Sequence, residues 1–239
     1  MNVTNRKCVV IFGATASILD EFYRLAGDAT IDLILVGRGL NRIRRSKGKC
    51  IRLELQPDFA KLDKCCMIAE QLNEQVDHYQ KENISFVFAQ GLIVRALFMH
   101  QTFDQITQQI DINLSYPMAM IHALIKQSEA YLNSNWILFS SLSVGKEKTA
   151  VIPYATTKLA LESFCLGLQD EINALRKSGL VSCVQILILD GGMSSGMPAY
   201  IRQRIEASFE TSFSDKESLA RHLLSLIDRS IGEHKVLQR

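Results

Sequence analysis

Short apolar segments alternate with longer helical patterns along the whole chain. The apolar segments are continuous rather than alternating, as Val184–Leu189 illustrates, which is typical of strands covered on both faces of a sheet. They cover Cys8–Phe12, Asp32–Val36, Cys50–Leu55, Ile84–Ala89, Asn135–Ser140 and Val181–Leu189, with a candidate short edge strand at His234–Leu237. The helical patterns cover Ile18–Ala26, Phe59–Gln80, Thr102–Tyr131, Tyr154–Lys177, Pro198–Phe209 and Lys216–Ser230. This order predicts an α/β fold: a doubly wound parallel sheet of six or seven strands with helices on both faces.

The candidate functional residues follow the predicted strands. Ligands of such sheets bind at the carboxyl ends of the strands, near the point where the strand order reverses. Glycine stands at four of these ends, namely at Gly13, Gly37, Gly91 and Gly191–Gly192, and Ser141 closes another strand. Any one of these glycines is explained as well by a simple turn. Their joint position favours close approach of the backbone to a ligand.

One pair of side chains indicates chemistry. Tyr154 and Lys158 are four residues apart at the start of a predicted helix, so they share a face about one turn apart. A neighbouring ammonium favours the phenolate, and we therefore expect the pKa of Tyr154 to fall toward neutrality. Ser141 could hydrogen-bond a carbonyl oxygen beside this acid or base. A surface Tyr and Lys at a common helical spacing is the alternative, and the pair alone does not decide.

Composition narrows the classes of function. The 239 residues carry a net charge of only +2, which gives no electrostatic case for nucleic-acid binding. No apolar run is long enough for a membrane span, and the first residues lack the apolar stretch of a signal peptide, so we expect a cytoplasmic protein. The six cysteines form no Cys-x-x-Cys pair and have no histidine at ligand spacing, so no metal site is expected. With four prolines, no internal repeat and no low-complexity linker, residues 1–239 are expected to form one domain.

The chain resembles the short-chain dehydrogenase/reductase family over nearly its full length, most strongly in its second half. The spacing of Asn113, Ser141, Tyr154 and Lys158 is similar to the catalytic tetrad of that family. The resemblance implies a Rossmann-like fold and hydride transfer between a nicotinamide cofactor and a carbonyl/alcohol pair. Tyr154 would be the general acid/base, and Ser141 would orient the substrate oxygen. Lys158 would bind the nicotinamide ribose, and Asn113 would hold a water in a proton relay.

The first turn of the cofactor site departs from the family pattern. The family has three glycines after its first strand, whereas this chain keeps Gly13 and has Ser17 and Leu19 at the other two positions. The resemblance implies cofactor contacts from Gly13, Thr15, Ser17 and Ile18. A helix that begins near Ser17 would still offer N–H groups to a pyrophosphate.

The remaining cofactor contacts lie after later strands. Arg38 follows the second strand at the place where an acidic residue would bind the ribose of NAD. An arginine there favours the 2′-phosphate of NADP, and Arg42 nearby could help to bind it. The resemblance also implies contacts from Ala89 and Gly91 after the fourth strand, where the family asparagine is lost. After the sixth strand it implies contacts from three residues, although Asp190 replaces the family proline there. These are Gly191, Met193 and Ser195.

The substrate, the partners and the class of protein stay open at this point. The resemblance implies a substrate lid at about residues 193–213, and Arg95, Arg202 and Arg204 could meet an anion, so a phosphorylated or sugar-derived substrate is one reading. Solvated basic residues are the other. The resemblance further implies a homodimer or homotetramer built by the helices Thr102–Tyr131 and Tyr154–Lys177. A non-catalytic NADP(H)-binding regulatory module, or a reductase domain of a larger biosynthetic protein, remain alternatives to a free-standing enzyme.

Overall fold

Six parallel strands form a single sheet in the part of the chain that the computed structural model describes, residues 6–26, 31–43, 49–55, 62–141, 149–175, 184–189 and 215–228. Their spatial order is β3-β2-β1-β4-β5-β6. The strands are β1 (Lys7–Phe12), β2 (Ile31–Gly37), β3 (Cys50–Glu54), β4 (Ile84–Phe88), β5 (Asn135–Ser141) and β6 (Val184–Leu189). The predicted parallel sheet is confirmed, while the candidate strand His234–Leu237 and the predicted helix Pro198–Phe209 lie outside the described residues.

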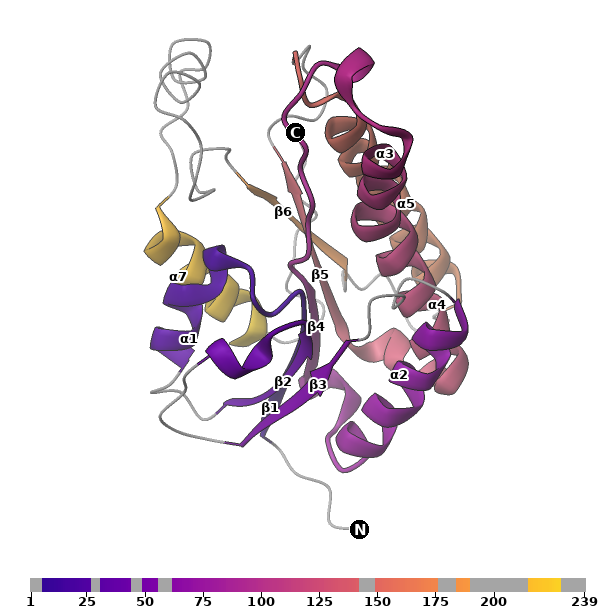
Figure 1. Ribbon diagram of the computed structural model, residues 1–239. Helices are drawn as coiled ribbons and strands as arrows, with labels where there is room; N and C mark the ends of the chain where they lie inside the picture. The colour runs from indigo at the N-terminus through magenta and orange to yellow at the C-terminus, as the bar shows by residue number, and fades with distance from the viewer. Residues whose placement is uncertain are drawn as a thin grey trace.

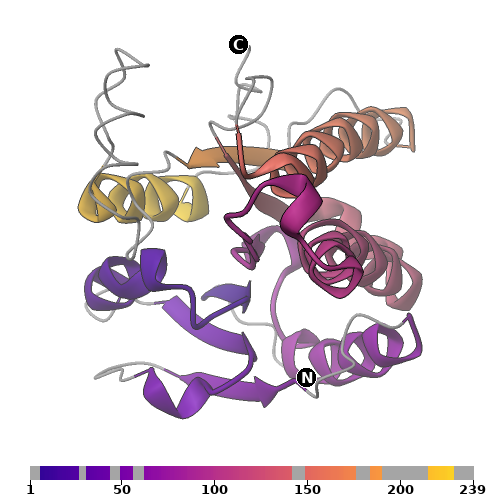
Figure 2. The same ribbon diagram turned by 45° about the horizontal axis from the view of Figure 1, so that its top comes forward.

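Helices cover both faces of the sheet (Figure 1). The six described α-helices are α1 (Asp20–Ala26), α2 (Leu62–Val76), α3 (Phe103–Ile110), α4 (Tyr116–Gln127), α5 (Ile152–Leu175) and α7 (Lys216–Asp228). Helices α1 and α7 lie together on one face, and α2, α4 and α5 lie on the other, as the turned view in Figure 2 also shows. The chain is therefore a three-layer α/β fold, as its alternating pattern predicts.

The continuous apolar strands supply both layers of the core. Successive side chains of a strand point to opposite faces, so Val10 and Phe12 of β1 join the cluster under α2, α4 and α5, whereas Val9 and Ile11 join the cluster under α1 and α7. Each of these four side chains is fully buried. A strand buried on both faces needs apolar residues at every position, which is why these strands show no alternation.

The strand order reverses between β1 and β4. From β1 the chain winds outward through β2 and β3, and it then returns to β4 on the opposite side of β1. The connections that leave the carboxyl ends of β1 and β4 consequently diverge, and a crevice opens between them. Gly13 and Gly91, the glycines that follow these two strands, lie at that crevice.

The predicted helix Thr102–Tyr131 is divided in the structure. α3 continues into a π-helical turn at Asp111–Ser115 and then into α4, and a 3-10 turn covers Glu129–Asn133. Pro117 lies in the first turn of α4 and has no N–H to donate, so the carbonyl of Asn113, four residues earlier, cannot receive its usual helical bond. The proline is a local sequence signal for this irregular turn, which surrounds a candidate functional residue.

Candidate functional site

The carboxyl ends of β4 and β5 and the first turns of α5 bring three of the predicted residues together. Ser141 is the last residue of β5, and its side chain hydrogen-bonds the phenol of Tyr154 in the first turn of α5. The ammonium of Lys158 lies 6.0 Å from the centre of the Tyr154 ring. α5 begins at Ile152, two positions before the predicted start, with Pro153 in its first turn, where the missing N–H does no harm.

Lys158 is a buried ammonium that joins two strand ends. Its side chain is 3% exposed, and its Nζ donates to the carbonyl of Phe139 at 2.8 Å and to that of Gln90 at 3.5 Å. Burial lowers the pKa of Lys158 to about 8, because desolvation disfavours the charged form. None of the ion pairs in the described ranges includes this lysine.

The phenol of Tyr154 behaves differently from the expectation. Burial raises its pKa above the ordinary value, and the hydrogen bond from Ser141 and the charge of Arg95 only partly oppose that rise. The prediction that Lys158 draws this pKa toward neutrality is therefore wrong for the protein without ligands. The physical reason is that desolvation outweighs the nearby charges, while the ammonium of Lys158 donates to backbone carbonyls.

Asn113 is buried and its carboxamide is engaged on both sides. Its Oδ1 accepts from the N–H of Leu92 at 2.7 Å, and its Nδ2 donates to the carbonyl of Leu92 at 2.9 Å and to Oγ1 of Thr157 at 3.2 Å. The side chain thus fastens the connection after β4 to the π-helical turn and to α5.

Gly13 makes a turn that no other residue fits. Its φ is +72°, and a Cβ at this position would lie 2.5 Å from the backbone nitrogen of Gln90. The N–H of Gly13 donates to Val36 at 3.0 Å, and the hydroxyl of Tyr23 donates to the carbonyl of Ala14 at 2.6 Å. The turn after β1 is consequently held against β2, β4 and α1 at once.

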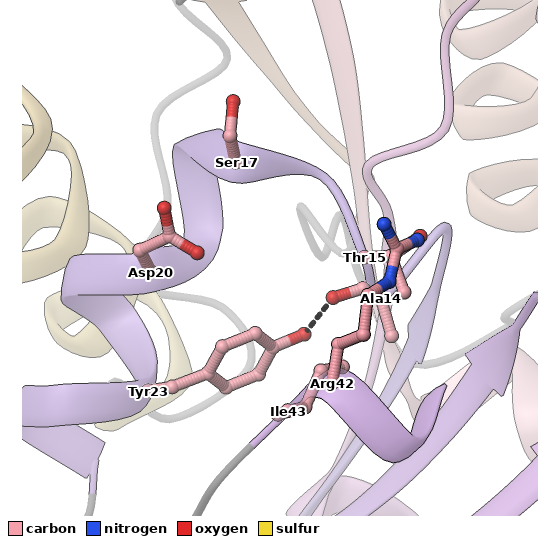
Figure 3. A pocket seen from close by; sticks show the side chains of 7 residues that line it. All are labelled: Ala14, Thr15, Ser17, Asp20, Tyr23, Arg42 and Ile43. Atoms are coloured by element: carbon pink, nitrogen blue, oxygen red, sulfur yellow. Dashed lines mark hydrogen bonds between the residues drawn. The ribbon is translucent and has the colours of Figure 1, made fainter. Parts of the chain in front are cut away.

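A pocket of about 290 Å³ opens between this turn and the short 3-10 turn that follows β2 (Figure 3). Its lining residues are Ala14, Thr15, Ser17, Asp20, Tyr23, Arg42 and Ile43. In the close-up, the hydroxyl of Tyr23 meets the backbone of Ala14 while the guanidinium of Arg42 lies beside that turn (Figure 3). Thr15 and Ser17, two of the predicted cofactor contacts, both line this pocket.

Other predicted cofactor residues stand around or beyond this pocket. Ile18 is half-buried and packs against the core cluster under α1 and α7, and Arg38 is exposed after β2. Ala89 is buried directly after β4, and a Cβ on Gly91 would lie 3.8 Å from Nζ of Lys158. The predicted contacts after β6 and the predicted lid at residues 193–213 lie outside the described residues. Those contacts are Gly191, Met193 and Ser195, beside Asp190.

Several contributors were not found from the sequence. Lys216 of α7 donates to the carbonyl of Ser17 at 2.6 Å and lies 3.3 Å from the carboxylate of Asp20. Because Lys216 and Ser17 are so far apart in the chain, no local pattern joins them. Gln109 was missed too, although it lies one helical turn before Asn113 and is fully buried. A glutamine on a predicted core-facing position was the available signal.

Comparison with known proteins identifies the fold. No family model and no curated protein sequence matches the chain. A solved structure described as a short chain dehydrogenase/reductase family protein is 20% identical, with a TM-score of 0.68 over 95% of this chain and 91% of its own. A variant of actinorhodin polyketide ketoreductase solved with NADPH is 14% identical, with a TM-score of 0.71 over 95% of this chain and 92% of its own.

A third solved structure gives the same result. The 3-oxoacyl-[acyl-carrier protein] reductase from Brucella melitensis is 14% identical, with a TM-score of 0.71 over 92% of this chain and 84% of its own. The chain therefore has the fold of short-chain dehydrogenase/reductase structures. In its described part, no helix is both long and apolar enough to cross a bilayer.

Proposed function

We propose that the protein is a short-chain dehydrogenase/reductase that uses NADP(H) to interconvert a carbonyl and an alcohol. The observation that carries the proposal is the convergence of Ser141, Tyr154 and Lys158 at the carboxyl ends of β4 and β5. A hydroxyl, a phenol and a buried ammonium meet beside the crevice where ligands of such sheets bind. A phenol beside a hydroxyl and an ammonium is a proton donor and acceptor suited to a carbonyl oxygen.

The residues around the crevice fit a dinucleotide. Gly13 brings bare backbone against Gln90, where a side chain would clash, and the pocket beside Thr15 and Arg42 has room for part of such a ligand. Oε1 of Gln90 is buried without a hydrogen-bond partner in the described structure, which suits an acceptor for a ligand hydroxyl. When bound, the nicotinamide supplies or accepts the hydride.

The proton step belongs to the protein. For reduction, Oη of Tyr154 would give its proton to the developing alkoxide, and Oγ of Ser141 would hold that oxygen by a hydrogen bond. The raised pKa of Tyr154, caused by burial, keeps the phenol protonated at neutral pH and so ready to donate. Lys158 would hold ribose hydroxyls, and its charge would stabilise the phenolate that the donation leaves.

Asn113 would return the proton through a water. The carboxamide is committed to Leu92 and Thr157, so it fixes the π-helical turn rather than touching solvent. The carbonyl of Asn113, which Pro117 deprives of its usual helical bond, would accept from that water. In this proposal, the side chain of Asn113 positions the turn and its backbone carbonyl takes part in the proton relay.

The preference for NADP over NAD would come from two arginine side chains. The backbone N–H groups of Gly39 and Leu40 are already taken by the carboxylate of Glu54, so the guanidinium groups of Arg38 and Arg42 must supply the contacts to a 2′-phosphate. We expect Arg38→Ala to weaken the binding of NADPH by about tenfold to a hundredfold, because a charge-assisted hydrogen bond is worth ~1.5–3 kcal/mol. NADH affinity should change far less. Fluorescence titrations with both cofactors measure this, and equal weakening of the two would refute the NADP preference.

The protein is proposed to form a homodimer or homotetramer through its outer helices. Ile152, Leu159 and Leu166 recur every seven residues along α5 and are each about half exposed, so they form one apolar stripe. On the neighbouring α3, Phe103 is 81% exposed. A second copy of the chain would cover this face about a two-fold axis. Light scattering that gives a clean monomer of 26.9 kDa at micromolar concentration would refute the assembly.

Leu159 lies in the middle of this stripe and is 49% exposed. Leu161, Leu168 and Ile172 of α5 are buried in the core instead. We expect Leu159→Glu to dissociate the oligomer, whereas Met67→Glu, at an exposed apolar residue of α2 outside this stripe, is the matched control.

We place the protein in the cytoplasm. The five described cysteines are free, which agrees with a reducing compartment. The single domain over residues 1–239, with a substrate lid at about 193–213, stays a prediction.

One experiment tests the activity. NADPH is titrated by its fluorescence, and its oxidation is then followed with a panel of aldehydes and ketones. Binding with turnover supports the reductase. Binding without turnover favours the non-catalytic NADP(H)-binding module, and no binding contradicts both.

A further inference from the structure

The connection between β4 and α3 is held in place by amide side chains. It runs from the end of β4 along the carboxyl edge of the sheet to α3 (Figure 1). Asn113 pairs with both backbone groups of Leu92, and one helical turn earlier the Oε1 of Gln109 accepts from the N–H of Val94 at 3.2 Å. Two carboxamides on successive turns thus replace the backbone partners that this extended segment would otherwise lack.

Gln109 is itself fully committed. It is completely buried, and its Nε2 donates to Oε1 of Gln101 at 2.9 Å and to the carbonyl of Gln105 at 3.1 Å. A buried carboxamide with donors and acceptor all satisfied holds one geometry, because any other arrangement leaves a buried polar group unpaired. The position of Val94 is therefore specified by the interior of the molecule.

The next anchor lies two residues further along. The N–H of Ala96 donates to the carbonyl of Ala150 at 3.0 Å, and Nε2 of Gln101 donates to the carbonyl of Ala96 at 3.0 Å. Ala150 has a φ of +69°, an unusual conformation for a residue with a side chain, and it lies two residues before the start of α5. The backbone of residue 96 is thus tied to the segment that leads into Tyr154.

Arg95 lies between these two anchors. Val94 is fixed to α3 and Ala96 to the entrance of α5, so the backbone of Arg95 has little freedom beside the first turn of α5. The side chain is half-buried. Burial raises the pKa of Tyr154 and the guanidinium of Arg95 opposes that rise, so the charge of Arg95 acts on the phenol.

We propose that Arg95 is a substrate-binding residue and that the substrate carries an anionic oxyacid group, a carboxylate or a phosphate, close to its reacting carbonyl. This inference rests on the proposed reductase function and names its substrate class. A planar guanidinium binds two oxygens of such a group side by side, which would fix the carbonyl relative to Tyr154 and Ser141. A neutral carbonyl compound has no group that needs a fixed cation at this position.

The test compares charged and neutral substrates in matched pairs. One pair is benzoylformate and methyl benzoylformate, and the other is dihydroxyacetone phosphate and dihydroxyacetone. The ratio of kcat/KM for the anionic over the neutral member is measured with NADPH for the wild type, Arg95→Gln and Arg95→Lys. Arg221→Gln is the control, because it removes one exposed positive charge from α7, far along the chain from the site.

The ratio separates substrate binding from effects on Tyr154. We expect Arg95→Gln to lower it by about tenfold to a hundredfold for one of the two pairs, mainly through KM, with Arg95→Lys intermediate and Arg221→Gln unchanged. The pair that responds identifies carboxylate or phosphate. If the charge of Arg95 acted only through Tyr154, its removal would slow both members of a pair equally and leave the ratio unchanged. An unchanged ratio would therefore overturn the proposal.

A failure of the proposed function is distinguishable from a failure of this inference. If the wild type oxidises NADPH with none of the four compounds, calorimetry with benzoylformate and with dihydroxyacetone phosphate replaces the kinetics. Binding of either anion that is at least tenfold weaker in Arg95→Gln than in Arg221→Gln still supports the anion site. Equal binding in these two variants, or none in the wild type, contradicts it.

Discussion

The two ends of the sheet treat a buried charge in opposite ways. At the amino end, Asp32 is 5% exposed and its carboxylate accepts three bonds: from Arg6 at 2.8 Å, from the hydroxyl of Tyr79 at 2.8 Å and from the N–H of Lys49 at 3.2 Å. At the carboxyl end, Lys158 is equally buried but donates only to carbonyl oxygens, and burial lowers its pKa to about 8. A counter-ion and a full set of donors stabilise the first charge, whereas the second is kept at a cost in stability.

This difference separates a buried charge that stabilises the fold from a buried charge of the kind found at functional sites. A charge that is paired and hydrogen-bonded fastens elements together, as Asp32 does for β2 and the Tyr79 segment. A charge that is buried without such compensation, and that therefore has a shifted pKa, is typical of functional sites. The carboxyl end also contains the left-handed turn at Gly13 and the buried, unpaired oxygen of Gln90. The same sheet thus has one end whose buried charge is compensated and one end whose buried polar groups are not.

The largest expected effect is the loss of catalysis in the variant Tyr154→Phe. Loss of the phenol hydroxyl should lower kcat by ~10²–10⁴, the usual worth of general acid catalysis, while the ring stays packed and NADPH affinity is nearly unchanged. Tyr79→Phe is the matched control at the other end of the sheet, where the hydroxyl bonds Asp32 and should matter for stability alone. Steady-state kinetics and NADPH titration measure both variants. A Tyr154→Phe rate above about a tenth of the wild type would remove this residue from its role.

The second effect is a loss of stability in the variant Asp32→Asn. The variant keeps the shape of the side chain but removes the charge that Arg6 and Tyr79 meet, so the free energy of unfolding should fall by ~1.5–3 kcal/mol. Urea unfolding followed by the fluorescence of Trp136, the one tryptophan of the chain, measures this. Catalysis by the folded fraction should stay near the wild type. An unchanged unfolding curve would contradict the stabilising role of the amino end.

The third effect is the pH dependence of stability that Lys158 causes. Its pKa is lower in the folded protein, about 8, than in the unfolded chain, so between these two pKa values the unfolded chain binds more protons. Stability should therefore rise with pH from about 8 until the ordinary lysine pKa of ~10.4, by up to ~1.4 kcal/mol per pH unit. Below pH 8 both states are protonated and the full cost of burial is present.

The variant Lys158→Met isolates this contribution. Burial raises the pKa of Cys8 and of Cys165 to about 12, and these thiols act in the opposite direction at high pH in both proteins. We therefore expect the difference in unfolding free energy, wild type minus variant, to increase between pH 8 and 10. A constant difference would show that Lys158 is not a destabilising charge.

The smallest expected effect is a higher affinity for the cofactor in the variant Ser17→Gly. Glycine at this position of the turn lets backbone N–H groups approach a pyrophosphate without a side chain between them, so NADPH should bind severalfold more tightly. Calorimetry on the two proteins measures the change. A weaker complex would instead show that the hydroxyl of Ser17 donates to the phosphate, and that this turn uses a side chain in place of bare backbone.

The pattern of apolar residues was sufficient for the layers of this fold. Continuous apolar runs such as Asn135–Ser140 predict strands buried on both faces, and the intervening helical patterns predict parallel crossovers. The errors lie at the ends and interruptions of helices. The π-helical turn at Asp111–Ser115 was missed because the apolar pattern runs on through it, although Pro117 marks the place.

The sequence by itself determined which residues stand at the carboxyl ends of the strands and that Tyr154 and Lys158 share a helical face. Both follow from local periodicity, since a strand end and a helical turn are set by neighbours in the chain. Only the tertiary structure decided the electrostatics of those residues. The phenol and the ammonium are desolvated by β4, β5 and α5 together, so the pKa of Tyr154 rises where the spacing alone predicted a fall. Likewise, Gln109 fixes Val94 and Lys216 reaches Ser17 across the fold, because hydrogen bonds between distant segments exist only once the layers have packed.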